Sequence, residues 1–187
     1  MAEQDCEKGW GIPGCHYSQS ARESSFERKG WIYASGRDGF RTPGLVFAKR
    51  LWEVKGIADT GFLVAFANRS DFHHDWAVKL GGQVSDPLLT CDAVLAETAF
   101  HLGDTALVLE FVRQGLVSPT LDVIDHLPRL LQIARRFEDQ KPDLADICLI
   151  RLSELYPQHS VITTDVHDFR MYRRNRREVI PLIVPPQ

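Results

Sequence analysis

Five acidic residues stand where an α/β protein could use them for chemistry. Asp59 and Asp165 each follow a short run of apolar or β-branched residues that is typical of a buried strand. In an open α/β sheet, ligands bind at the carboxyl ends of the strands. The other three acids lie among apolar residues in two segments with helical spacing. We therefore expect one acidic cluster at one edge of a sheet, made of Asp59, Glu97, Asp143, Asp146 and Asp165.

A cluster of this kind calls for divalent cations, because carboxylates gathered within a few ångströms repel one another. Oxygen ligands favour Mg²⁺ or Mn²⁺ over Zn²⁺, which prefers His and Cys. Such a cation lowers the pKa of a bound water and neutralises charge on a phosphodiester under attack. The cluster thus predicts a metal-dependent hydrolase of phosphodiester bonds. No serine, thiol or histidine pattern in the sequence gives comparable support to a nucleophilic mechanism.

Each acid also has an interpretation without chemistry. Asp143, beside Pro142, could simply favour the positive end of a helix. Asp59 and Asp165 could be turn residues that follow strands. Glu97 could lie on the rim of its helix, and the acid at position 146 could face solvent in a second turn. Only the joint pattern favours a metal site over these alternatives.

The elements that must position the acids alternate between short strands and helices. Glycine, proline and N-capping residues punctuate them. Strands are predicted at Gly56–Ala58, Val84–Leu88, Leu116–Val117, Ser160–Thr163 and Val179–Val184. Helices are predicted after Thr60-Gly61, at about 75–80, 91–102, 127–137 and 143–156, and between an Asp104 cap and Gly115. The helical spacing also predicts buried side chains for Leu131 in the 127–137 helix and for Leu144 and Leu155 in the 143–156 helix. This alternation predicts a parallel α/β sheet with both faces covered.

The first fifty-three residues differ from the rest of the chain. Residues 1–53 are rich in Gly, Ser, Arg and Trp and show no sustained helical or strand period. We interpret them either as a disordered extension or as the product of a start codon assigned too far upstream. A partner-binding arm is the third interpretation. Residues 54–187 form the predicted catalytic domain.

Composition places the chain among ordinary globular proteins. Of its 187 residues, 44% are hydrophobic and 25% are charged. The net charge of -3 does not by itself indicate a nucleic-acid partner. Cys91 and Cys148 are expected to be reduced core residues, whereas a disulfide between Cys6 and Cys15 stays an alternative. No apolar run resembles a signal peptide or a membrane span, so the expected compartment is the cytoplasm.

Four segments, in order, resemble the motifs of PIN-domain ribonucleases, and most of all the VapC-type toxins of bacterial toxin–antitoxin pairs. They are Ile57–Ala65, Leu95–Glu97, Asp143–Asp146 and Ile162–Asp165. The resemblance covers about Val54 to Pro185. It implies a PIN-like three-layer α/β/α sandwich with a short-stranded, mainly parallel central sheet.

The resemblance also implies an activity, an endoribonuclease dependent on Mg²⁺ or Mn²⁺. By the family pattern, the residues that hold the metal and activate water are Asp59, Glu97, Asp146 and Asp165. Asp143 is similar to an extra metal-binding acid that many members carry near the site. The residues similar to supporting positions of the family are Thr60, Thr163 and Asp168.

A basic run follows the last motif, where it could hold RNA phosphates near the metal. The predicted RNA contacts are Arg170, Arg173 and Arg174, with Arg176 and Arg177 in the same run. The alternative is a solvated loop. The toxin resemblance further implies a small antitoxin in the active-site groove and a homodimer.

Three alternatives to the toxin stay open. A phosphotransferase or receiver-like domain would use Asp59 as nucleophile, but Gly61 stands where a haloacid-dehalogenase type of phosphatase has its second aspartate. A PIN-like fold could act only as a binding module. A PIN-domain RNA-processing nuclease would act without an antitoxin. The sequence does not indicate which RNA is cleaved.

Overall fold

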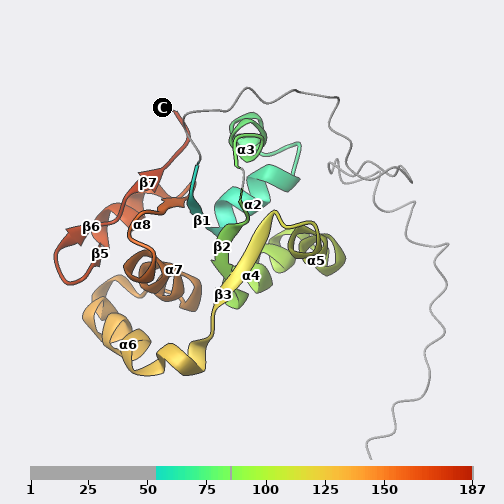
Figure 1. The fold of residues 1–187 in the computed structure, drawn as a ribbon. Coiled ribbons are helices and arrows are strands. Elements are labelled where there is room, and N and C mark those ends of the chain that lie inside the picture. Colours follow the sequence, from blue (N-terminus) through green and yellow to red (C-terminus); the bar gives the residue numbers. More distant parts are fainter. Residues whose placement is uncertain (1–53, 85, 187) are drawn as a thin grey trace, which may run out of the picture. The chain divides into compact units, whose positions relative to one another are not determined.

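The computed structural model describes residues 54–84 and 86–186, so the interpretations of residues 1–53 and of the Cys6–Cys15 pair lie outside the described residues. Short strands alternate with helices along this part of the chain (Figure 1). The strands are β1 (Gly56–Ala58), β2 (Leu88–Cys91), β3 (Val117–Leu121), β4 (Ser160–Ile162), β5 (Arg173–Arg174), β6 (Glu178–Val179) and β7 (Leu182–Ile183). The helices are α2 (Thr60–Ala67), α3 (His74–Gly81), α4 (Asp92–Leu102), α5 (Thr105–Arg113), α6 (Val123–Arg136), α7 (Leu144–Leu155) and α8 (Val166–Met171), with a 3-10 turn, η3, at Glu138–Gln140.

Five strands form one parallel sheet in the order β3-β2-β1-β4-β7. Ile57 of β1 pairs with Leu89 on one side and with Val161 on the other. The chain therefore builds outward from β1 through β2 to β3 and then crosses back to place β4 on the opposite side of β1. This reversal lies between β1 and β4, which is where open α/β sheets bind ligands. Strands β5 and β6 form a separate antiparallel hairpin.

Helices cover both faces of the sheet, as Figure 1 shows, with α6 and α7 on one side and α2, α3 and α5 on the other. Helix α7 packs against β1, β2 and β4, and α6 packs on α7. Because α7 lies between two layers, it is apolar on almost every side, and its residues Cys148, Leu149, Ile150 and Leu152 are fully buried. The predicted three-layer α/β/α sandwich with a mainly parallel sheet is confirmed.

Several local signals of the sequence act as predicted. Gly103, with φ of 63°, ends α4 in the left-handed conformation that glycine adopts without strain. Asp104 then caps α5, since its carboxylate accepts a hydrogen bond from the backbone N–H of Leu107 at 3.0 Å. Cys91 and Cys148 are buried free cysteines, as expected. Among the described residues, no helix is long and apolar enough to cross a membrane.

The predicted second strand was misplaced. The sequence suggested Val84–Leu88, but β2 runs from Leu88 to Cys91. Pro87 lacks an N–H, so pairing with β3 begins one residue later, where the N–H of Leu88 donates to Leu116 O at 3.0 Å. Helix α7 also begins one residue later than predicted, at Leu144, because Asp143 caps the helix.

The buried faces of two helices were predicted incorrectly in part. Leu131 was expected to point inward but is 48% exposed, because Leu130 and Ile133 form the buried stripe of α6. Leu144 and Leu155, at the two ends of α7, were also expected in the core and are 51% and 36% exposed. Both residues lie at the ends of α7, whereas Cys148, Leu149 and Ile150 in its middle are fully buried.

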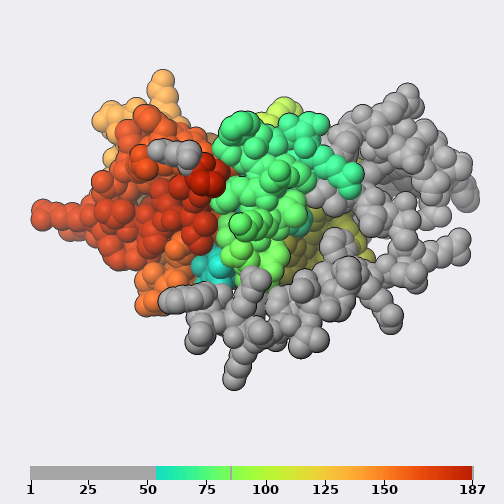
Figure 2. All heavy atoms as spheres, turned by 90° about the horizontal axis from the view of Figure 1, so that it is seen from above, coloured from blue at the N-terminus to red at the C-terminus, as the bar shows by residue number. Residues whose placement is uncertain are grey.

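Residues distant in the sequence share one surface beside the β1–β4 pair. Figure 2 shows the segments near the carboxyl terminus, in orange and red, lying against the turquoise and green segments that follow β1. This agrees with the pairing of Gly56 with Ser160 and of Ala58 with Ile162. The ends of β1 and β4 are thereby held side by side, and the site described next lies there.

Candidate active site

A pocket of about 360 Å³ gathers the acids that the sequence singled out. All five predicted metal ligands line it, namely Asp59, Glu97, Asp143, Asp146 and Asp165. Its wall also includes Thr60, Gly61, Asp71, His101, Thr164 and Asp168. Four separate elements contribute the acids: the ends of β1 and β4, the middle of α4 and the start of α7. The pocket therefore lies at the reversal of strand order.

Asp59 is the most constrained of these acids. It caps α2 and is only 8% exposed. Its backbone N–H donates to Ile162 O at 3.1 Å, which fixes the end of β1 against β4. Its Oδ1 accepts from the Thr60 N–H at 2.6 Å, and its Oδ2 accepts from the Thr163 hydroxyl at 2.6 Å. Both carboxylate oxygens thus have a donor, although neither donor carries a charge.

The hydroxyl of Thr163 joins two of the predicted acids. It donates its single proton to Asp59, and its Oγ1 accepts a hydrogen bond from the Asp165 N–H at 2.8 Å. Thr163 is fully buried, so no water competes for this hydroxyl. Asp165 in turn caps α8, with its Oδ1 accepting from the Asp168 N–H at 3.1 Å. One side chain therefore orders the ends of both β1 and β4.

Glu97 and Asp146 each have a hydroxyl partner as well. Thr60 Oγ1 donates to Glu97 Oε2 at 2.9 Å, which links the first residue of α2 to the middle of α4. Tyr172 OH donates to Asp146 Oδ2 at 3.1 Å. Asp143 caps α7, since its Oδ1 accepts a hydrogen bond from the Asp146 N–H at 2.8 Å. This agrees with the alternative interpretation of Asp143 as a residue that favours the positive end of a helix. Asp143 nevertheless lines the pocket beside Asp146.

Burial, and to a smaller extent repulsion from neighbouring acids, raises the pKa values of Asp59, Glu97 and Asp146. Burial raises the pKa of Asp59 to about 6, against the lowering effect of its bonds from Thr163 and Thr60. Burial, followed by the negative charge of Asp143, raises the pKa of Asp146 to about 7. Burial also raises the pKa of Glu97 above its ordinary value. A positive charge in the pocket would reverse these shifts, because it favours the ionised carboxylates.

The donor set of the pocket fits a hard divalent cation. Its acids offer carboxylate oxygens, and Mg²⁺ is held in proteins by a few carboxylates together with water. Among the residues that the structure describes, no three Asp, Glu, His or Cys side chains already stand in the arrangement of a finished metal site. The acids line a common pocket, and burial raises the pKa values of Asp59 and Asp146 because it disfavours their ionised forms, which a cation would stabilise.

The predicted RNA contacts differ in their availability. Arg170 is exposed, whereas Arg173 is partly buried and its Nη1 donates to Arg170 O at 2.6 Å and Tyr172 O at 2.8 Å. Neither residue lines the acid pocket.

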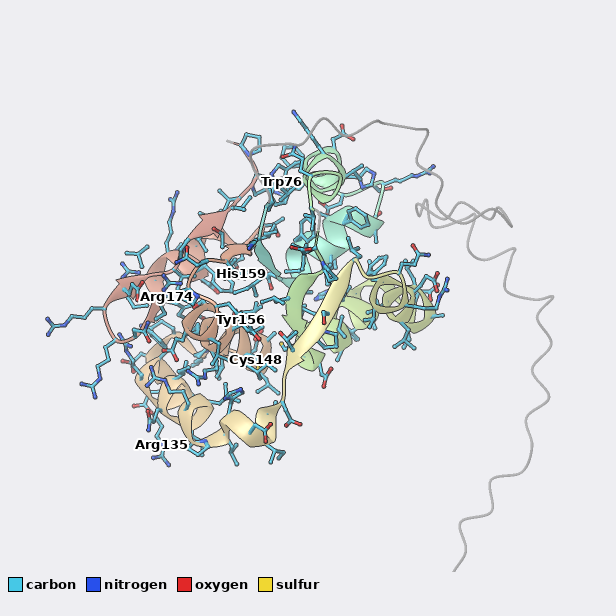
Figure 3. All side chains as sticks on the ribbon, in the orientation of Figure 1. Trp76, Arg135, Cys148, Tyr156, His159 and Arg174 are labelled. Atoms are coloured by element: carbon cyan, nitrogen blue, oxygen red, sulfur yellow. The ribbon has the colours of Figure 1, made fainter. Side chains whose placement is uncertain are left out.

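Arg174, the third predicted RNA contact, is labelled in Figure 3; its side chain is only 5% exposed, which leaves its guanidinium group little access to RNA. Its Nη1 donates to Ser153 O at 2.9 Å and to Pro157 O at 3.2 Å, and its Nη2 donates to Glu178 at 2.6 Å. Arg174 therefore anchors the β5–β6 hairpin to the end of α7.

Sequence reasoning missed several residues of the site. Asp71 and His101 line the pocket without belonging to any of the predicted motifs, and Thr164 lies within the last motif but was assigned no role. Tyr172 carried no signal, because its contact with Asp146 spans 26 residues and follows no helical or strand period. Gly61 also lines the pocket, and a Cβ there would lie 2.1 Å from Thr164 Oγ1, so any larger residue would require the Thr164 side chain to move.

Comparison with known proteins agrees with this geometry. The PIN-domain family model matches residues 57–174, a stretch that extends from β1 to β5 and includes every acid of the pocket. No curated protein sequence matches the chain. PIN domains are generally nucleases and generally bind Mg²⁺ or Mn²⁺. Because the match covers more than half of the sequence, the chain belongs to the PIN-domain family.

Proposed function

We propose that this PIN domain is an endoribonuclease that hydrolyses RNA phosphodiester bonds with Mg²⁺ or Mn²⁺. The observation that carries the proposal is the single pocket at the ends of β1 and β4 that the five predicted metal ligands line together. Two of them, Asp59 and Asp146, have pKa values raised towards neutrality. Such a pocket is costly to keep ionised without cations, and this is the charge environment that a metal-dependent nuclease needs.

The residues of the pocket take separate roles in this proposal. Asp59, Glu97, Asp146 and Asp165 hold the cation, and Asp143 adds a further carboxylate next to Asp146. When bound by these residues, a cation would supply the charge that lowers the pKa of an attacking water and that neutralises the phosphodiester.

Hydroxyl groups supply the positioning. Thr163 fixes Asp59 and Asp165 together, and Thr60 fixes Glu97. Asp168 supports Asp165 through its backbone N–H. Arg170 and Arg173 are the proposed RNA contacts beside the pocket.

The same proposal includes a biological setting. The chain acts as a VapC-type toxin in the cytoplasm, as a homodimer whose acid pocket is blocked by a small antitoxin. Residues 54–187 form the nuclease domain, and residues 1–53 are an extension to it. The order of the four motifs supports the toxin assignment, since Asp59, Glu97, Asp146 and Asp165 occur in the sequence order of that family.

The nuclease is tested with the full chain and one matched pair of variants. Asp146→Asn should abolish RNA cleavage in Mg²⁺ or Mn²⁺ without unfolding the protein. Asp92→Asn is the control, because Asp92 follows β2 at the sheet edge but does not line the pocket. Cleavage that persists in EDTA, or in the Asp146 variant, would refute the proposal.

The toxin role has its own test. Expression of the chain should arrest growth, and co-expression of a small protein encoded immediately upstream should restore it. Growth arrest that no neighbouring reading frame relieves would instead support an RNA-processing nuclease without an antitoxin.

One observation favours a second function, a PIN-like binding module without catalysis. The described residues include no ready group of three metal ligands. Calorimetric titration with Mn²⁺ separates the two functions: binding heat that disappears in the Asp146→Asn variant supports the nuclease. Absence of both binding heat and cleavage supports the module.

A further inference from the structure

A second pocket, of about 310 Å³, lies between α6 and the turn that joins β5 to β6, and it shares no residue with the acid pocket. Its lining residues are Arg129, Gln132, Ile133, Arg136 and Arg176. Three of these five side chains are guanidinium groups and none is acidic. We propose that this arginine pocket binds a backbone phosphate of the RNA that the acid pocket cleaves. The inference rests on the proposed function and adds a substrate-binding site to it.

The charges around the arginine pocket are poorly balanced. Glu154 is the one acid that pairs with its lining residues in the described part of the chain, and its side chain is only 3% exposed. This single carboxylate accepts from Arg129 Nε at 2.9 Å, from Arg151 Nη1 at 3.0 Å and from the Asn175 N–H at 3.1 Å. Glu154 can neutralise only one of its two arginines, so excess positive charge remains.

The other two arginines of the pocket add to that excess. Among the described residues, neither Arg136 nor Arg176 forms an ion pair with an acid. The guanidinium group of Arg136 lies 4.9 Å from the centre of the Phe137 ring and donates to the Arg176 carbonyl oxygen. These contacts fix its position but leave its charge uncompensated. An anion is therefore the ligand that this pocket favours.

The backbone of the hairpin turn is consistent with a role for the Arg176 side chain. Asn175 and Arg176 have φ of 45° and 75°, in the left-handed region that side-chain-bearing residues seldom adopt. Asparagine is common in the left-handed conformation, so position 175 is little strained, whereas a glycine would relieve the strain at position 176. Glu178 holds the turn through Arg174 and Asn175, at 2.6 and 3.0 Å. The fold thus places an arginine, at a cost in backbone strain, at a pocket that already contains two others.

Position favours a nucleic acid over a small anion. Phe137, which follows Arg136, packs on Tyr172 with ring centres 5.2 Å apart, and Tyr172 donates to Asp146 in the acid pocket. A series of contacts through Phe137 and Tyr172 therefore links a residue of each pocket, Arg136 and Asp146. A polymer with repeated phosphates can occupy both, whereas a single phosphate ion gains from only one. Guanidinium groups suit this ligand because their planar donors match the oxygens of a phosphate.

The test measures binding rather than cleavage, so that it stands apart from the nuclease test. Full-length protein in EDTA is titrated against a fluorescein-labelled oligouridine, with anisotropy as the signal, over a series of KCl concentrations. Arg136→Gln and Arg176→Gln should each weaken binding about fivefold, the upper range for an exposed ion pair. Each should also reduce the slope of log affinity against log salt by about 0.7, as expected for one lost phosphate contact on a single strand.

Arg135→Gln is the matched control, because Arg135 is the neighbouring exposed arginine on α6, loses the same charge and does not line the pocket (Figure 3). It should leave the salt slope unchanged. Equal binding by all three glutamine variants, or no binding by the unaltered chain, would overturn the proposal. If the nuclease assignment alone fails, Mn²⁺-dependent cleavage is absent while the difference between these variants persists.

Two further variants distinguish binding from a structural role. Arg176→Gly should weaken RNA binding while the melting temperature stays the same or rises, because glycine relieves the left-handed backbone. Arg136→Lys should keep the salt slope but bind less tightly, since it retains the charge and loses the planar fork. A lower melting temperature of Arg176→Gly in parallel with its lost binding would overturn the assignment.

Competition identifies the ligand class. Unlabelled oligouridine should displace the labelled RNA at far lower phosphate concentration than inorganic phosphate does. Equal potency of the two competitors would assign the pocket to a free anion. Stronger displacement by oligoglutamate than by RNA would assign it to an acidic protein segment. Either result would overturn the RNA assignment.

Discussion

Replacing Thr163 by valine removes one buried hydroxyl with little change of shape, and its effect should depend on pH. The hydroxyl donates to Asp59 Oδ2 at 2.6 Å and accepts from the Asp165 N–H at 2.8 Å. A hydrogen bond to a charged group contributes about 1.5–3 kcal/mol and one between neutral groups about 1 kcal/mol. We therefore expect Thr163→Val to lower the free energy of unfolding by about 2.5–4 kcal/mol where Asp59 is ionised.

The sign of the pH dependence follows from the pKa of Asp59. The Thr163 hydroxyl lowers this pKa, which burial raises from 3.8 to about 6, so its removal raises the pKa further. When the pKa of a carboxyl group is higher in the folded than in the unfolded state, its contribution to stability is complete at pH values below the unfolded-state pKa. This contribution is lost as the pH rises through the folded-state pKa. Above about pH 6, the free energy of unfolding of the variant should therefore fall further below that of the unaltered chain. Below about pH 6, Thr163→Val should lower the free energy of unfolding by only about 2 kcal/mol, because both lost hydrogen bonds then join neutral groups.

Urea unfolding of the full chain in EDTA, at several values between about pH 5 and pH 8, measures this difference. Thr90→Val is the matched control, because Thr90 is equally buried and its Oγ1 donates to the neutral Ala58 carbonyl at 3.1 Å. The control should cost about 1 kcal/mol at every pH. If both variants lose the same free energy across the whole range, the account of Thr163 as the link between two acids is refuted.

The acid pocket also supports three shorter predictions. Without divalent cations, the melting temperature should fall as the pH rises from about 4 to about 7, because acids with raised pKa values, such as Asp146 at about 7, must ionise in the fold. Mg²⁺ or Mn²⁺ added at about pH 8 should restore the melting temperature. A melting temperature that calorimetry finds independent of pH would contradict this prediction. Tyr172→Phe removes a donor from Asp146 and should move its pKa, followed by carbon-detected NMR, further above its ordinary value; an unchanged titration would count against the contact. Gly61→Ala brings a Cβ within 2.1 Å of Thr164 Oγ1 and should cost about 1–3 kcal/mol in urea unfolding, whereas Gly82→Ala, with its nearest neighbour atom at 3.6 Å, should cost almost nothing; similar losses would show that the close approach is not the cause.

The parts of the site that the sequence predicted are those with a local signal. The apolar runs before Asp59 and Asp165 indicated two buried strands, and parallel strands place their carboxyl ends at one edge. Asp143 and Asp146 could be assigned to one helix start from their spacing. These signals are short-range, so no knowledge of distant contacts was needed to expect that the acids meet.

The parts that could not be predicted depend on contacts between distant segments. A run of arginines does not reveal which side chain points inward, and the two-residue strand β5 buries Arg174 while Arg173 stays partly exposed. The inward direction is determined by the carbonyl groups of Ser153 and Pro157, about twenty residues earlier in the chain. Leu131 was misassigned for a similar reason, since the position of α7 decides which stripe of α6 is covered.

Charge pairing separates the acids of the pocket from acids elsewhere on the protein. Outside the pocket, Glu110, Glu154 and Glu178 each form an ion pair with arginine. Inside it, no described Lys or Arg pairs with any of the five acids, whose hydrogen bonds come from hydroxyl and backbone N–H groups.

This difference has a physical consequence. A lysine or arginine at position 60 or 163 would fix the acids as firmly, but it would also neutralise them and lower their pKa values. A threonine hydroxyl positions Asp59 or Glu97 and adds no charge. The negative charge of the pocket is therefore not compensated by any described basic side chain, and burial without such a partner raises the pKa values of Asp59 and Asp146.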